Sequence, residues 1–400
     1  MKQLLHTPEG VRDIYDGECA RRREIEDRIR KVFKQFGYFD IQTPTFEFFD
    51  IFSKERGSVA SREMYKFFDR DGNTLVLRPD MTPPIARCAA KYFMDETCPI
   101  RLSYLANTFI NNSSYQGRLK ERTQAGAECI GDDTSDADAE MIAMVIGCLQ
   151  ACGFREFQID IGHVNFFKGL VEEAGLDDET ADELRDLIER KNFFAVESLI
   201  TSKEIPESLK DAFLNMSQMF GGIDRVKEAK TMTKNEKAQQ ALKRLENLYH
   251  ILQCYGLEQY VSFDLGLLGT YRYYTGIVFR AFTYGTGEAI GSGGRYDHLM
   301  RQFGKDAHSV GFALNIDQIM AALSRQAISV EVPEVVLLVY DKSCQEKAIQ
   351  VATQMRQNKE NVQMLRKRSA LAIEAYRDYM TNNQISRMYY LDSDGIREVK

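Results

Sequence analysis

The 400-residue sequence lacks several features that would assign it to a class at once. It has no tryptophan, no Cys-x-x-Cys pair and no histidine cluster near its eight cysteines, which argues against structural zinc. No run approaches the roughly 18 apolar residues of a membrane-spanning helix, and the charged, proline-bearing start does not fit a signal peptide. We therefore expect a cytoplasmic protein with no membrane contact, no metal and eight buried thiols.

The sequence also has no excess of positive charge. Lys and Arg number 52 against 59 Asp and Glu, so the formal net charge of -7 provides no global attraction to nucleic acid. Hydrophobic residues make up 44% and charged residues 28%, which are ordinary values for a globular chain. The length predicts about two to three domains.

The first part of the sequence alternates between helix and strand patterns. An apolar helical face follows Glu18, and Gly37 ends it before a strand from Tyr38 to Pro44. The dipeptide Asp71-Gly72 lies between two β-prone runs, which is typical of a tight hairpin. Further strands are predicted at residues 100–110, 123–130 and 157–161, and helices at residues 85–92 and 140–152.

The later part of the sequence changes character twice. Residues 166–255 are charged and helical, and we interpret them as an insertion in a larger domain spanning residues 1–325. Residues 327–334 read as a linker. The pattern of residues 335–400 predicts a small α/β domain in which strands alternate with helices. The strands are expected at 335–340, 362–366 and 385–391 and the helices at 345–356 and 370–380.

The stretch from Gly266 to Met300 combines many tyrosines and glycines with almost no helical periodicity. Residues 273–282 favour a strand, and the glycines of residues 284–294 suit a turn with close backbone approach. Taken alone, this stretch either lines a binding site or forms an ordinary hairpin with half-buried tyrosines.

Seven motifs together resemble the histidyl-tRNA synthetase-like family over residues 7 to 323. In chain order they are TPEGVRDI, LRPDMT, QGR, QAGAE, YYTGIVF, GGRYD and VGFALNID. The resemblance implies an α+β fold of the class II synthetase type, a mainly antiparallel sheet flanked by helices. It also implies a dimer formed through the segment around Pro44.

The resemblance also implies a pocket for histidine. The matching positions are Asp80, Thr82, Gln124, Glu128, Tyr273, Tyr274 and Tyr296. Asp80 and Thr82 can accept hydrogen bonds from an α-ammonium group. Gln124 and Glu128 lie four apart in a strand and so face the same side. Tyrosine and carboxylate together suit imidazole, which has a flat face and two polar nitrogens.

The cations that amino-acid activation needs are missing from the matching positions. Ile110, Gly269 and Gln318 stand where the synthetase pattern has arginines that stabilise the charge on phosphate. Each loss could cost on the order of 3 kcal/mol of transition-state stabilisation. We therefore expect no catalytic residues and no adenylation, and Arg118 and Arg272 remain as candidate anion contacts.

This combination favours one kind of family member, the non-catalytic regulatory subunit of ATP phosphoribosyltransferase. That kind implies assembly with a short catalytic subunit, L-histidine as effector, and a homodimer within a hetero-oligomer, with no cofactor. The alternatives are a histidine-tRNA ligase and a synthetase-like sensor of histidine or tRNA. The short, mixed-charge segment after Val335 weighs against tRNA recognition.

Overall fold

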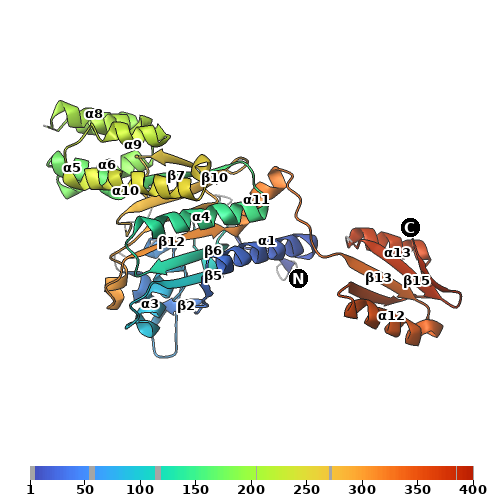
Figure 1. Ribbon diagram of the computed structural model, residues 1–400. Coiled ribbons are helices and arrows are strands. Elements are labelled where there is room, and N and C mark those ends of the chain that lie inside the picture. Colours follow the sequence, from blue (N-terminus) through green and yellow to red (C-terminus); the bar gives the residue numbers. More distant parts are fainter. Residues whose placement is uncertain are drawn as a thin grey trace. The chain divides into compact units, whose positions relative to one another are not determined.

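The computed structural model describes residues 5–53, 59–112, 119–203, 205–269, 273–383 and 385–399, without the side chains of residues 53, 208 and 217 (Figure 1). The chain divides into two compact units. The first comprises Met1–Arg12 with Glu26–Ser329, and the second Asp13–Ile25 with Val330–Lys400. None of the described helices combines the length and the apolar composition needed to cross a membrane. The predicted anion contacts Arg118 and Arg272 lie outside the described residues.

A large sheet, with nine strands in the part of the chain described, runs through the first unit. In spatial order the strands are β1 (Phe39–Asp40), β5 (Ile100–Phe109), β6 (Glu121–Ile130), β12 (Ser309–Asn315), β11 (Gly291–Arg295), β10 (Ile277–Thr283), β7 (Phe157–His163), β9 (Val261–Asp264) and β8 (Phe220–Gly221). All neighbours from β5 to β7 pair antiparallel, whereas β1 with β5 and β7 with β9 are parallel. The predicted α+β fold with a mainly antiparallel sheet is confirmed.

Two helices pack apolar side chains against one face of this sheet. They are α1 (Asp16–Gln35) and α4 (Ser135–Cys152), and α11 (Ile316–Arg325) follows β12. Phe33 of α1 meets Phe312 of β12 edge to face, with ring centroids 6.0 Å apart. Since successive side chains of a strand point to opposite faces, Gly311 and Ala313 face the other side of the sheet. That other side is the one available for a site.

A smaller sheet and a short helix lie beside the first strands. The sheet contains β2 (Phe46–Phe48), β4 (Thr74–Leu77) and β3 (Lys66–Phe68), with α2 (Asp50–Ser53) after β2. The predicted turn at Asp71-Gly72 joins β3 to β4, and Gly72 has a φ of +82°. After β4 the chain turns into α3 (Thr82–Tyr92), where Pro83 and Pro84 occupy the first turn because a missing N–H costs nothing there. This turn places Asp80 and Thr82 at a helix start.

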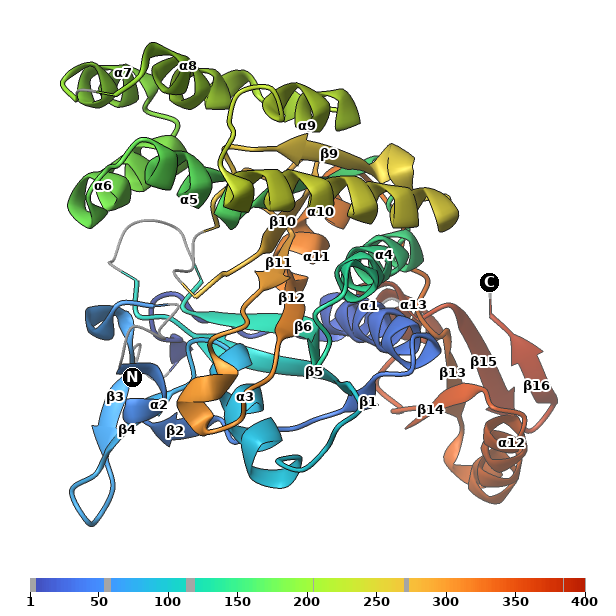
Figure 2. The same cartoon turned by 60° about the vertical axis from the view of Figure 1, so that its left-hand side comes forward.

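The region predicted as a helical insertion is built mainly of helices. They are α5 (Val164–Glu173), α6 (Asp178–Glu189), α7 (Phe193–Thr201), α8 (Glu207–Asn215), α9 (Ile223–Ala229) and α10 (Glu236–Cys254). Figure 2 shows them together at one end of the first unit, on the side of β10 and away from α3. The predicted apolar face of α10 is buried, including Leu242, Leu245 and Leu248. Short 3₁₀ turns occur at Ser61–Glu63, Met216–Gln218, Glu258–Tyr260, Met300–Phe303 and Lys342–Cys344.

The second unit contains a small α/β sheet. Its strands lie in the order β14 (Asn361–Arg366), β13 (Val335–Tyr340), β15 (Arg387–Asp392) and β16 (Gly395–Glu398), with helices α12 (Gln345–Gln357) and α13 (Ile373–Asn382). The first three strands are parallel, as expected from alternating strands and helices. The antiparallel β16 was not predicted.

Three local predictions are wrong. The strand predicted at residues 273–282 begins at Ile277, because Tyr274 turns into the core and Thr275 is held by a backbone hydrogen bond to Arg295. The strand before Pro44 is reduced to two residues at a sheet edge.

The eight cysteines are not all buried. Cys98 lies exposed in a loop and Cys254 at a helix end, whereas Cys129, Cys148 and Cys152 are buried.

Candidate functional site

A cavity of about 160 Å³ lies over strands β6, β12 and β11. The start of α3 and the segment before β10 form its walls. Six of the seven residues predicted to bind histidine line it: Asp80, Thr82, Gln124, Tyr273, Tyr274 and Tyr296. Glu128, the seventh, lies beneath the cavity and bonds to two of its lining residues. The chain thus brings together predicted residues from segments as far apart in the sequence as Asp80 and Tyr296.

Glycine at position 311 makes room for Glu128. On the paired strands β6 and β12, Gly311 lies opposite Glu128 and Asn315 opposite Gln124. A Cβ atom added at Gly311 would lie 1.6 Å from Oε2 of Glu128. The glycine therefore allows a long carboxylate side chain to lie flat across the neighbouring strand.

Glu128 is a buried carboxyl group with two hydroxyl donors. Its side chain is 1% exposed, and it accepts hydrogen bonds from Thr82 Oγ1 at 2.9 Å and from the hydroxyl of Tyr296. Burial raises the pKa of Glu128 to about 8, the nearby charge of Asp80 adds to this, and the two hydrogen bonds oppose it. Near neutral pH the carboxyl group of Glu128 is therefore protonated and can share its proton with a neighbouring base.

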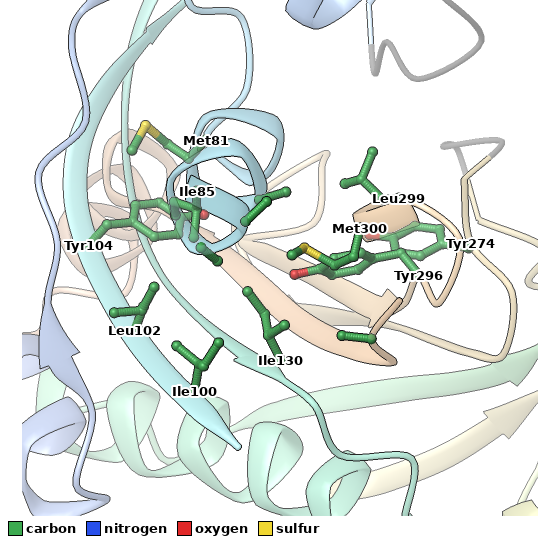
Figure 3. Close-up of a cluster of buried hydrophobic side chains, with 14 of the residues drawn as sticks. Met81, Ile85, Ile100, Leu102, Tyr104, Ile130, Tyr274, Tyr296, Leu299 and Met300 are labelled. Carbon is green, nitrogen blue, oxygen red and sulfur yellow. The ribbon is translucent and has the colours of Figure 1, made fainter. Parts of the chain in front are cut away.

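Three tyrosines form the aromatic wall. The ring of Tyr273 meets Tyr274 at 5.0 Å and Tyr296 at 5.9 Å, both edge to face. Tyr274 and Tyr296 belong to the buried apolar cluster that also contains Met300 and Leu299, and Figure 3 shows their rings beside these side chains. Packing in the core fixes the two rings, so the wall is preformed for a flat ligand.

The opposite end of the cavity is rich in hydrogen-bond acceptors. Asp80 is 6% exposed and accepts a long hydrogen bond of 3.5 Å from the hydroxyl of Tyr273. Oε1 of Gln124 is buried and has no hydrogen-bond partner among the described residues. A buried acceptor left without a donor costs about 1–3 kcal/mol, so this atom is suited to a ligand that brings an N–H group.

Arg122 also lines the cavity and was not predicted as a site residue. It lies two residues before Gln124 on β6, on the same face of the strand. The sequence did not signal it, because Arg122 precedes the strand predicted at residues 123–130 and the family motif does not place a site residue there. Ser292, Glu288 and Asn315 are other lining residues outside the predicted set.

Gly269 cannot hold an arginine without rearrangement. Its φ is +82°, a conformation that residues with a Cβ rarely adopt, and a Cβ there would lie 2.7 Å from the ring of Tyr274. The difference at this position is therefore one of backbone path as well as of charge.

The arginine of the GGRYD motif supports the sheet rather than the cavity. The side chain of Arg295 is 3% exposed and donates to Asp138 Oδ1 of α4 at 2.6 and 2.9 Å. It also donates to the carbonyl oxygen of Asp132 at 2.8 Å. This buried ion pair joins β11 to the start of α4 and leaves the next residue, Tyr296, directed at Glu128.

Known proteins resemble the chain over nearly its whole length. The histidyl-tRNA synthetase family profile matches residues 10–319. A protein of Acetivibrio thermocellus called ATP phosphoribosyltransferase regulatory subunit is 45% identical over 88% of this chain and 84% of its own length. One of the same name from Ruminiclostridium cellulolyticum is 42% identical over 98% of this chain and 94% of its own.

Solved structures agree with the sequence relatives. A Bacillus halodurans structure described as an ATP phosphoribosyltransferase regulatory subunit/histidyl-tRNA synthetase has a TM-score of 0.87 and 32% identity, covering 97% of this chain and 98% of the other. A Nostoc histidyl-tRNA synthetase shares the fold, with a TM-score of 0.83 at 19% identity over 99% of this chain and 96% of the other. The chain belongs to the histidyl-tRNA synthetase-like family and, within it, to the ATP phosphoribosyltransferase regulatory subunits.

Proposed function

We propose that this non-catalytic regulatory subunit binds L-histidine in the cavity and conveys histidine feedback inhibition to a short catalytic ATP phosphoribosyltransferase subunit. In this proposal the chain forms a homodimer within a hetero-oligomer and enables the first step of histidine biosynthesis. The names of its relatives support the regulatory role and the partnership with a catalytic subunit.

The main support for histidine as the ligand is the buried Oε1 of Gln124, which has no hydrogen-bond partner in the part of the chain that the structure describes. Together with Asp80 it offers acceptors for an α-ammonium group. At the other end, Glu128 beneath Tyr296 offers a group that can exchange a proton with an imidazole nitrogen. Histidine carries both groups on one small molecule with a flat ring that suits the tyrosine wall.

The same region argues against amino-acid activation. Ile110, Gly269 and Gln318 supply no cation, and the backbone at Gly269 does not accommodate one without moving Tyr274. Activation builds negative charge on a phosphate, which needs donors aimed at it. A site with an amino-acid pocket and no such donors at these positions is suited to sensing histidine rather than consuming it.

Feedback inhibition requires more than tight binding. Histidine must bind the inhibited and the active assemblies with different affinities, since equal affinity would shift no equilibrium. The catalytic subunit must therefore change the cavity, directly or through the elements that hold its walls.

The test is reconstitution with the short catalytic subunit. We expect phosphoribosyl transfer that depends on this chain and falls on adding L-histidine, and calorimetry should detect histidine binding to this chain or to the complex. Glu128→Gln should weaken both effects. Binding to neither form would refute the sensor role, and robust histidine-dependent exchange of pyrophosphate into ATP would instead identify a ligase.

A further inference from the structure

Arg122 presents an unused cationic group to the cavity. Its Nε donates to the carbonyl oxygen of Leu119 at 3.1 Å, and its terminal guanidinium nitrogens meet no acceptor among the described residues. No other Lys or Arg in the described part of the chain lines this cavity. Arg122 is half-buried as a residue, and a charge-assisted hydrogen bond in a partly buried position is stronger than in water.

Glu288 and Asp80 are the carboxylates among the described lining residues that could cancel this charge. No ion pair joins either of them to Arg122 in the described part of the chain, and each has a contact of its own. The terminal nitrogens of Arg122 therefore remain available to an anion that enters the cavity.

The order of side chains along β6 matches the order of groups in an α-amino acid. Arg122, Gln124 and Glu128 share one face of the strand, with Cα atoms about 7 Å apart between Arg122 and Gln124 and about 13 Å apart between Gln124 and Glu128. A histidine with its ring toward Glu128 and its ammonium group at Gln124 has its carboxylate one bond from the same Cα atom. That carboxylate lies away from Glu128, within reach of a long arginine side chain.

We propose that Arg122 receives the α-carboxylate of bound histidine and thereby makes the site specific for the intact amino acid. This inference rests on the proposed histidine site and adds the residue that binds the third functional group of the ligand, its α-carboxylate. The guanidinium fork matches a carboxylate geometrically, so it rejects ligands that lack one.

Calorimetry with L-histidine and histamine tests the proposal, because histamine keeps the imidazole and amine but has no carboxylate. We expect Arg122→Gln to weaken L-histidine binding about ten- to a hundredfold and to leave histamine binding unchanged. Arg122→Lys should retain part of the affinity for L-histidine. Arg70→Gln removes the same charge from an exposed hairpin position and should change neither ligand's affinity.

The outcomes separate this inference from the proposed function. If the unmodified chain and its complex bind no histidine, the histidine site itself is wrong and this inference fails with it. If they bind L-histidine and Arg122→Gln binds it equally well, the sensor role stands and the role of Arg122 is refuted. Equal losses for L-histidine and histamine would show that Arg122 shapes the cavity instead, which also refutes it.

Discussion

At the residue scale, the proton of Glu128 links the site to the stability of the fold. Burial raises the pKa of Glu128 from its ordinary value of 4.5 to about 8, so the folded chain keeps a proton that the unfolded chain releases. Its contribution to stability is complete below the unfolded pKa and is lost as the pH rises through about 8. One proton changes the free energy of unfolding by at most about 1.4 kcal/mol per pH unit.

Glu128→Gln should therefore flatten the pH dependence of stability. The neutral amide cannot titrate, so the free energy of unfolding should fall less between about pH 6 and about pH 8 than in the unmodified chain. Urea unfolding at both pH values measures this difference. Glu331→Gln, at an exposed carboxyl group in the linker, is the control, and parallel curves for Glu128→Gln and the unmodified chain would contradict the prediction.

Gly311→Ala tests the space that Glu128 occupies. The added methyl group would lie 1.6 Å from Oε2 of Glu128, so the carboxyl group must move and lose its hydrogen bonds from Thr82 and Tyr296. We expect a destabilisation of about 1–3 kcal/mol in thermal unfolding, with weaker histidine binding. Gly287→Ala is the matched control because no atom lies within 4 Å of its added Cβ. Equal stability of the two variants would count against a fixed Glu128 position.

The family motifs indicated six of the residues that line the cavity, because the resemblance assigns those positions to an amino-acid pocket. They did not predict Arg122, since a resemblance transfers only the positions that the family pattern contains. They also did not predict the backbone conformation at Gly269, because a missing arginine in a sequence indicates lost charge but says nothing about φ. That conformation depends on the ring of Tyr274, which comes from packing.

At the element scale, helix α6 holds the segment that leads to the tyrosine wall. Arg185 donates to the carbonyl oxygens of Gly269 at 2.9 Å and Leu268 at 3.3 Å. Glu189, one turn later, accepts from the N–H of Leu268 at 2.7 Å and from Arg280 of β10 at 3.0 Å. The helical insertion thus contributes to the position of the cavity wall without lining the cavity.

Arg185→Gln should loosen this wall. Each hydrogen bond contributes about 0.5–1.5 kcal/mol, so we expect histidine affinity to fall about three- to tenfold and amide hydrogen exchange of residues 265–269 to rise. Arg190→Gln, at the exposed end of the same helix, should change neither. An unchanged affinity for Arg185→Gln would show that the helix supports the segment without influencing the site.

Elements with a clear local signal were predicted well: α1 and α10 from their apolar faces, α4 from its apolar composition, and the hairpin between β3 and β4 from Asp71-Gly72. Errors arose where tertiary contacts override local preference. Tyr273 and Tyr274 have strand propensity, yet they lie outside the sheet because Tyr274 packs in the buried cluster and the ring of Tyr273 packs against Tyr274 and Tyr296. The two-residue strand β8 and the terminal β16 have too little pattern to stand out.

At the scale of the whole molecule, the proposed regulation makes a reciprocal prediction. If histidine changes the affinity of this chain for its catalytic subunit by some factor, the catalytic subunit must change the affinity for histidine by the same factor, because both paths connect the same states. Allosteric couplings of this kind are typically about 5- to 150-fold. We expect calorimetric titration of histidine into the free chain and into the complex to give two dissociation constants, whose ratio measures the coupling. Titration of the catalytic subunit with and without histidine should give the same ratio.

Arg185→Gln should alter both ratios together if helix α6 transmits the coupling, whereas Arg190→Gln should leave both unchanged. A ratio of one in both titrations would mean that histidine occupancy of this cavity is not what regulates the catalytic subunit.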